Sequence, residues 1–269
     1  MVGTVALICG SWVSFGYLGQ LVGLLDTTPS RSCVICSLNC IFVAIVSEFM
    51  RVKSSTSRGF DTSFDLRTLG PALVAVLGVA IVELKGAAGD PTVGDLISFC
   101  QPVGFGMGYL ILEDLMKKQP SAALPVSAIK LLVVSTVALA YFELSPHAAI
   151  PGATEWGFHG ILPDFRPILA SPLAVAAILY MGLVTTSLSL YVESIAFQRV
   201  PATDASIILT TEPLFAAAVS AVLIGETFGP SDLVGASFIV GACVYAIKMG
   251  TAEEVCDAVT MECQVVEKD

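Results

Sequence analysis

The chain has 269 residues, of which 55% are hydrophobic and 13% are charged, and its formal net charge is −10. Average soluble domains contain about 25% charged residues, so this composition and a mean hydropathy of +0.83 indicate a polytopic membrane protein without an appended soluble domain. No basic patch suggests a nucleic-acid partner, and the lipid bilayer is the expected surrounding.

Eight apolar segments have about the length that crosses a hydrocarbon core of roughly 30 Å as a helix. They are predicted at Val2 to Leu25, Ser32 to Met50, Leu69 to Leu84, Val93 to Leu112, Leu124 to Phe142, Pro172 to Val192, Ala205 to Ile224 and Leu233 to Ile247. The first segment lacks a basic start and is followed by further spans, so we interpret it as a transmembrane helix and not a signal peptide. The expected fold is all-α and membrane-spanning.

Cysteines and histidines favour packing and loops over metal binding. Cys33, Cys36 and Cys40 form a C-x2-C-x3-C pattern on one helix face, which we interpret as close packing of small residues in preference to a metal or redox site. His147 and His159 lie in a proline-rich stretch that reads as an aqueous loop. No metal or cofactor is expected.

The segment from Ala205 to Ile224 carries Glu212 and Pro213 where a membrane span would be deepest. A carboxylate at that depth is costly unless it is protonated, paired or facing water. Proline removes a backbone donor and leaves carbonyls that need partners inside the protein. Kinked or broken helices at mid-membrane are typical of transporter binding sites, so a functional role and a structural hydrogen bond are both open for Glu212.

The sequence Thr211-Glu212-Pro213-Leu214-Phe215, followed by small residues, Leu223-Ile224-Gly225-Glu226, Gly235 and Gly241, resembles the fourth and fifth helices of an EamA-type repeat. This is the pattern of the drug/metabolite transporter superfamily. The resemblance is strong over Tyr180 to Lys248 and weaker over the rest of the apolar chain. It implies two inverted five-helix repeats around a central cavity.

On that resemblance, residues 1–88 form a partial first repeat of three helices, residues 89–249 a complete second repeat, and residues 250–269 an acidic cytosolic tail. The stretch from Pro29 to Phe42 parallels Ala202 to Phe215, which puts Asn39 in the place of Glu212. Two helices are missing relative to the family's usual ten. A truncated start and a genuine eight-helix form both remain open.

Polar groups within the spans are the candidate cavity lining, because lipid would penalise each of them. The predicted substrate-binding residues are Gln20, Asn39, Gln101, Tyr109, Tyr180 and Glu212, with Thr185 as a further candidate. Glu212 is also the predicted coupling residue, since a buried carboxyl can switch its protonation. Lys130 is interpreted as a snorkelling lysine, with binding of an anionic substrate group as the alternative. Glu48 and Glu226 are expected at helix ends in structural contacts.

The leading interpretation is a secondary transporter of small organic metabolites that works by alternating access, with a homodimer as a further expectation for partners. The rival is a non-transporting truncated remnant or membrane scaffold of the same fold. No Gly-x-Ser-x-Gly, His-Glu-x-x-His or phosphate-binding loop is present in the sequence, so an enzyme is not expected.

Orientation follows from the lysines and arginines on alternate sides of the membrane. Ten lie on the side of both termini, namely Arg51, Lys53, Arg58, Arg67, Lys117, Lys118, Lys130, Arg199, Lys248 and Lys268, against Arg31, Lys85 and Arg166 on the other. Both ends are therefore predicted to be cytosolic, or stromal in an organelle. The acidic tail from Thr251 to Asp269 is interpreted as a solvated, partly disordered segment.

Overall fold

The computed structural model describes residues 2–56, 69–83, 92–144, 169–223, 230–249, 253–256 and 263–266. The chain divides into two compact units, each assembled from separate parts of the sequence. Unit 1 comprises residues 1–27 and 91–202, and unit 2 comprises residues 28–90 and 203–269. These units cut across the predicted division into repeats, which stays a prediction about the sequence.

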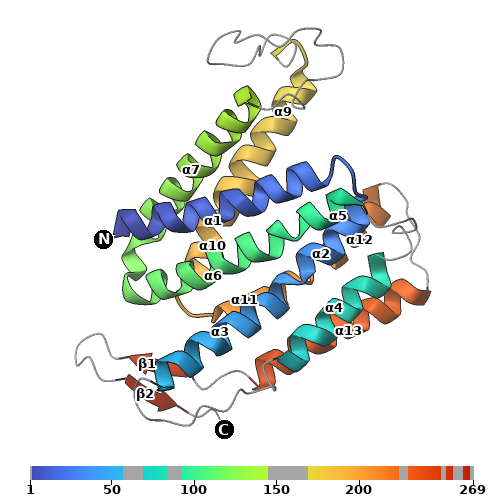
Figure 1. Ribbon diagram of the computed structural model, residues 1–269. Helices are drawn as coiled ribbons and strands as arrows, with labels where there is room; N and C mark the ends of the chain where they lie inside the picture. The colour runs from blue at the N-terminus through green and yellow to red at the C-terminus, as the bar shows by residue number, and fades with distance from the viewer. Residues whose placement is uncertain are drawn as a thin grey trace. The chain divides into compact units, whose positions relative to one another are not determined.

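Unit 1 is built on the helix α1, which packs against three other segments of the unit. Its described elements are α1 (Val2–Gly23), α5 (Val93–Ser98), α6 (Cys100–Lys118), η3 (Pro120–Ala122), α7 (Ala123–Leu144), α9 (Pro172–Tyr180), η5 (Met181–Leu188) and α10 (Ser189–Ala196). Helix α1 contacts α5, α6 and α7, and α10 contacts α6 and α7. Figure 1 shows α1 running alongside α6.

Small residues allow α1 and α6 to approach closely. A β-carbon added at Gly104 of α6 would lie 2.5 Å from the backbone nitrogen of Gly16 and 2.7 Å from the carbonyl oxygen of Trp12. A β-carbon at Gly19 would lie 2.4 Å from that of Cys100. Lipid offers no hydrophobic drive for helix association, so this close backbone packing is a main attraction between the two helices.

Hydrogen bonds join the end of α1 to the start of α5. Thr92 and Asp95 form a capping box, in which the Thr92 hydroxyl accepts from the Asp95 backbone and the Asp95 carboxylate accepts from the Thr92 backbone. The Thr27 hydroxyl also donates to Asp95, and Asp26 accepts from the backbone of Gly94. These contacts satisfy amides at the helix start that would otherwise lack partners.

Unit 2 contains the remaining helices and a short β-hairpin. Its described elements are α2 (Pro29–Ser37), α3 (Asn39–Thr56), α4 (Leu69–Glu83), α11 (Ala202–Leu209, whose first residue belongs to unit 1), α12 (Glu212–Leu223), α13 (Pro230–Met249), β1 (Glu253–Cys256) and β2 (Cys263–Val266). Helix α4 packs along α13 and also contacts α2 and α3. The buried core consists of Cys40, Ala72, Ala75, Ile207, Ala242, Cys243 and Ala246.

The predicted all-α membrane fold is confirmed for the helical part of the chain. Among the described residues, five helical segments are long and apolar enough to cross a membrane, and two shorter apolar helices cover Leu69–Ile81 and Leu233–Ala246. Helices α11 and α12 together occupy the remaining predicted span. Three spans predicted as continuous are interrupted, at Leu38, at Phe99 and at Thr210 to Thr211.

Two expectations need correction. Part of the acidic tail forms an antiparallel hairpin, in which β1 pairs with β2 and Glu253 faces Val266 in the register. Glu48 lies inside α3, which continues to Thr56, and its side chain is buried, so it is not at a helix end. Glu226 and both histidines lie outside the described residues.

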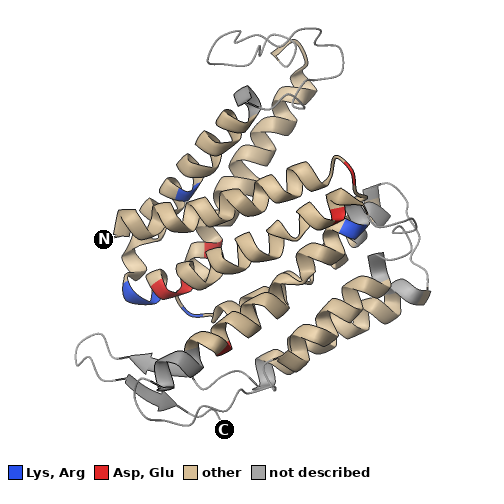
Figure 2. Cartoon of the chain, in the orientation of Figure 1, with Lys and Arg blue, Asp and Glu red and all other residues tan. Residues whose placement is uncertain are grey.

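Charged side chains are rare along the described helices and lie mainly near helix ends (Figure 2). In the last turns of α6, Lys117 forms an ion pair with Glu113, and Lys118 forms one with Asp114. Such surface pairs contribute little to stability. Among the exceptions are Glu48, which is buried inside α3, and Lys130, which lies inside α7 and is completely buried.

Candidate functional site

Two spans of unit 2 are broken in the same way. Helix α2 ends at Ser37 and α3 begins at Asn39, while α11 ends at Leu209 and α12 begins at Glu212. Asn39 and Glu212 are thus each the first residue of the second helix of their span. Pro213 explains the second break, because its ring cannot continue the helix from α11.

The break before Glu212 is satisfied by local hydrogen bonds. The Thr210 hydroxyl donates to the Ile207 carbonyl at 2.6 Å, and the Thr211 hydroxyl donates to the Ile208 carbonyl at 2.7 Å. The thiol of Cys243 on α13 also donates to the Ile207 carbonyl, at 3.6 Å. Freed carbonyls therefore find partners inside the protein, as a break within a membrane span requires.

The break before Asn39 has equivalent contacts. The Ser37 hydroxyl donates to the Val34 carbonyl at 2.7 Å, and the Cys40 thiol lies 3.1 Å from the Ser37 carbonyl. The same thiol lies 3.6 Å from the carbonyl of Ala72 on α4. Cys40 thus packs in the core of unit 2 and ties the broken span to its neighbour, which agrees with the predicted packing role.

The two breaks are neighbours within unit 2. Cys40, which directly follows Asn39, and Ile207 of α11 belong to one buried cluster. The side chain of Asn39 is buried, whereas that of Glu212 is exposed within its unit. The structure therefore brings the surroundings of these two predicted site residues together.

The other predicted site residues lie in unit 1. Gln101 is the second residue of α6 and is completely buried, and Gln20 is half-buried on the facing part of α1. Tyr109 is half-buried, with its ring 5.4 Å from that of Phe197 between centroids. Tyr180 is 60% exposed at the end of α9, and Thr185 is also exposed.

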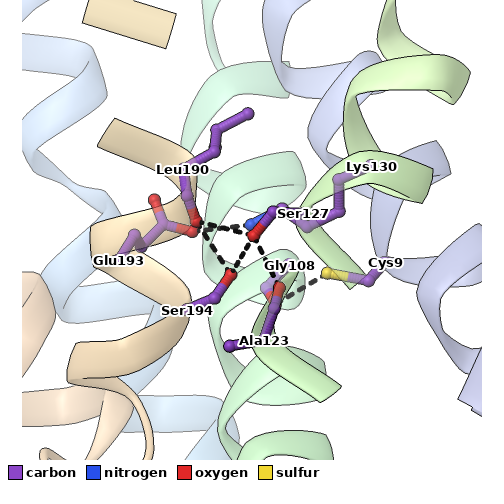
Figure 3. Close-up of polar contacts among 8 residues, drawn as sticks. All are labelled: Cys9, Gly108, Ala123, Ser127, Lys130, Leu190, Glu193 and Ser194. Carbon is purple, nitrogen blue, oxygen red and sulfur yellow. Dashed lines mark hydrogen bonds and ion pairs between the residues drawn. The ribbon is translucent and has the colours of Figure 1, made fainter. Parts of the chain in front are cut away.

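Unit 1 contains a buried ion pair that the sequence did not lead us to expect. The Lys130 ammonium on α7 lies 2.8 Å from the Oε1 atom of Glu193 on α10 (Figure 3). Lys130 has no exposed side-chain surface, and Glu193 retains 23%. The interpretation of Lys130 as a snorkelling residue is wrong, because its amino group turns to a carboxylate within the protein and not to the membrane surface.

Serines extend this ion pair into a polar cluster, which we define as Ser127 and Lys130 of α7 with Glu193 and Ser194 of α10. The Ser127 and Ser194 hydroxyls lie 2.9 Å apart, and both are buried. Each hydroxyl also donates to the Leu190 carbonyl, at 3.2 Å from Ser127 and 2.8 Å from Ser194. Figure 3 shows these side chains pointing toward one another across the two helices.

Helix α1 packs against α7 beside the polar cluster. A β-carbon added at Gly10 would lie 3.3 Å from the Cα atom of Lys130. The neighbouring Cys9 thiol donates to the carbonyl of Gly108 on α6 at 3.4 Å. Tyr109, a predicted site residue, follows Gly108 directly along α6.

Glu193 was missed because it lies just beyond the predicted end of its span at Val192. A signal was available in the sequence. Lys130 is a base inside an apolar segment, and such a charge needs an opposite charge on another span. Glu193 lies within the observed apolar segment Pro172–Ala196 and is the only acid in that segment.

A hollow of about 420 Å³ lies on the outer face of α1, lined by Ile8, Ser11, Trp12 and Phe15. These residues follow helical spacing along one side of α1, and the lining is mostly apolar. None of the predicted site residues belongs to this lining. The hollow therefore shares no lining residue with the polar cluster of unit 1.

Apolar helices with paired breaks and charges buried between helices define an integral, multi-pass membrane protein. The model of the "EamA-like transporter family" matches residues 92–247. The chain belongs to this family. This match confirms the resemblance stated from the sequence. Members of the family are membrane transporters and not enzymes. No curated protein matches the chain.

The fold also resembles that of a solved structure described as "Crystal structure of protein". The match has a TM-score of 0.64 at 13% sequence identity, and it covers 92% of this chain and 86% of the other. At this identity the likeness concerns the fold alone. It nevertheless extends over regions outside the matched family segment.

Proposed function

We propose that the protein is a secondary transporter of small organic metabolites that works by alternating access. The observation that carries this proposal is the pair of broken spans in unit 2, within a chain of the EamA-like transporter family. Broken helices expose backbone groups and helix ends where a polar substrate can bind in place of water. Continuous apolar helices would offer no such groups.

Asn39 and Glu212 are proposed as the central substrate-binding residues. Each begins a second half-helix, where the backbone amides of the first turn are directed outward and the helix dipole is positive. The Glu212 carboxylate supplies the complementary charge for a cationic group or a proton. Gln20, Gln101, Tyr109 and Tyr180 are proposed as further hydrogen-bonding contacts.

The test is uptake of labelled amino acids and other small metabolites into proteoliposomes, with and without a pH gradient. We expect the wild type to accumulate at least one compound under a gradient, and Glu212→Gln to lose this gradient-dependent uptake. The matched control is Asp114→Asn, which removes a carboxylate from an exposed ion pair at the end of α6. It should transport as the wild type does.

Two results would contradict the proposal in different ways. If Glu212→Gln kept full gradient-dependent uptake, Glu212 would have no part in coupling or binding. If the wild type transported no member of a broad panel in either direction, the scaffold interpretation would replace the transporter. The two results separate the role of the residue from the function of the whole protein.

A further inference from the structure

The span that carries Glu193 changes helix type immediately before the polar cluster. Residues Met181–Leu188 form a π-helix, η5, between the α-helices α9 and α10. Two serine hydroxyls bond to carbonyls five residues earlier, from Ser187 to Gly182 at 2.7 Å and from Ser189 to Val184 at 3.4 Å. π-helical segments are rare and occur frequently at functional sites.

The more extensive described contacts of this span are at its α10 end. Within unit 1, α9 and η5 contact each other and η5 contacts α10, and of these three segments α10 is the one with extensive contacts to α7 and α6. Among the described residues of Pro172–Ala196, Leu190 and Ser194 of α10 are the buried ones. The attachment of the span to unit 1 therefore depends on α10, and α10 depends on the polar cluster for its polar contacts with α7.

Breaking one side of a buried ion pair is strongly destabilising, because it leaves the other charge buried and uncompensated. Lys130 is the member that cannot tolerate this loss, since none of its side chain is exposed. Glu193 retains some exposed surface and is the member of the pair that the protein encloses less completely. The geometry therefore makes the contact between α7 and α10 sensitive to the protonation of one carboxylate.

We propose that protonation of Glu193 releases α10 from α7, with η5 as the hinge, and that this is the proton-coupling step of the transporter. The coupling of this release to transport rests on the proposed function, whereas the release itself does not. The proton comes from the aqueous phase and adds to the carboxylate of Glu193, which becomes neutral. Lys130 keeps its proton and its charge, so the ammonium must leave its buried position to regain a partner or water.

Other ionisable groups surround the pair. Helix α1 brings the Cys9 thiol, which interacts electrostatically with both Lys130 and Glu193. Helix α6 brings Tyr109 and, one turn further, Glu113, which pairs with Lys117 and accepts from the Ala202 backbone at 2.8 Å. Helix α10 itself carries Tyr191, and η3 and η5 contain no acid or base.

Among these groups, Glu193 is the carboxylate that pairs directly with Lys130. Glu113 is the other acid, and its two oxygens already bond to Lys117 and to the Ala202 backbone. A change of charge at Glu113 would act on the end of α6 and not on the contact between α7 and α10. The control for the test therefore includes a variant at this residue.

The test is amide hydrogen exchange of the full-length protein in lipid nanodiscs, measured as the pH is lowered and corrected for the intrinsic pH dependence of exchange. In the wild type, the amides of α10 should lose protection on acidification, with exchange rising on the order of tenfold or more. In Glu193→Gln, which mimics the protonated side chain, α10 should exchange rapidly at every pH. Glu113→Gln should keep the wild-type pH response.

A double variant separates release from misfolding. Lys130→Gln combined with Glu193→Gln removes both charges and leaves two amides that can bond to each other, and replacing a whole buried pair is often neutral or stabilising. We expect α10 to be protected at every pH in this variant. Wild-type protection that did not depend on pH, or a double variant that exchanged as fast as Glu193→Gln, would overturn the proposal.

Transport measurements then distinguish this inference from the proposed function. In proteoliposomes, Glu193→Gln should lose gradient-driven uptake while keeping exchange of substrate across the membrane without a gradient. Gradient-driven uptake retained in Glu193→Gln would show that this carboxylate is not the coupling group, even if the protein is a transporter. A wild type that released α10 on acidification but moved no substrate would contradict the transporter function and the coupling step, and leave the release itself established.

Discussion

Ser127 and Ser194 illustrate how single hydroxyls stabilise helix contacts in this protein. Their mutual contact and their shared acceptor, the Leu190 carbonyl, lie beside the Lys130 ion pair. Between membrane helices, hydrogen bonds of this kind contribute about 0.6 kcal/mol on average and up to about 1.7 kcal/mol. The polar cluster is therefore held by several weak hydrogen bonds around one strong ion pair, that of Lys130 with Glu193.

Ser127→Ala should lower the unfolding free energy by about 0.6 to 1.7 kcal/mol, because it removes the hydroxyl that links α7 to α10. The measurement is reversible unfolding in mixed micelles. Ser135→Ala is the matched control on the same helix, since its exposed hydroxyl bonds only to carbonyls of α7 itself. Equal effects of the two substitutions would contradict the assigned role of Ser127.

At the scale of the element, the interface between α1 and α6 depends on glycines. Helices approach this closely only where at least one of them carries no side chain at the contact. Gly104, Gly16 and Gly19 meet that condition, as the short distances to an added β-carbon show. The same condition holds in unit 2, where a β-carbon at Gly78 of α4 would lie 2.8 Å from the Gly235 carbonyl of α13.

Gly104→Ala should therefore destabilise the protein by about 1 to 3 kcal/mol, because the added methyl group would overlap the backbone of Gly16. The measurement is the thermal unfolding midpoint in detergent. Gly241→Ala is the control, since an added β-carbon there meets nothing within 4 Å. It should leave the midpoint unchanged or raise it slightly through better helix propensity. A stable Gly104→Ala protein would contradict the close packing of α1 on α6.

The broken spans also belong to this scale. Pro213 made the break before Glu212 predictable, because proline cannot continue a helix. The interruption at Leu38 has no proline within it and was not predicted from the sequence, and Leu38 itself keeps right-handed helical angles.

At the scale of the whole molecule, the chain passes three times between two units. Residues 1–27 lie in unit 1, residues 28–90 in unit 2, residues 91–202 in unit 1 again, and the remainder in unit 2. Each unit thus combines helices from the early and the late part of the sequence. A substitution in the early part can therefore affect helices encoded far downstream.

The excess of lysine and arginine on one side predicts that both termini face the cytosol or the stroma. Epitope tags added at the two ends should both be digested by protease in inside-out vesicles and both be protected in right-side-out vesicles. A tag in the loop between Leu144 and Ser171 should show the opposite pattern. Digestion of only one terminal tag in either preparation would mean an odd number of spans.

Hydropathy by itself determined the membrane class, the approximate positions of the helical segments and the unusual site at Glu212 and Pro213. These features are local, because about 20 consecutive apolar residues define a span wherever the rest of the chain lies. The residues from Thr211 to Gly241 were also enough to indicate the transporter family.

Only the tertiary structure decided which helices pair and which charges meet. Gly16 contacts a glycine 88 positions later, and Lys130 contacts a carboxylate 63 positions later. Such contacts depend on how distant segments pack, which no local pattern in the sequence specifies. For this reason Lys130 could be recognised as unusual from the sequence, while its pairing with Glu193 and the π-helix before α10 became visible only in the folded protein.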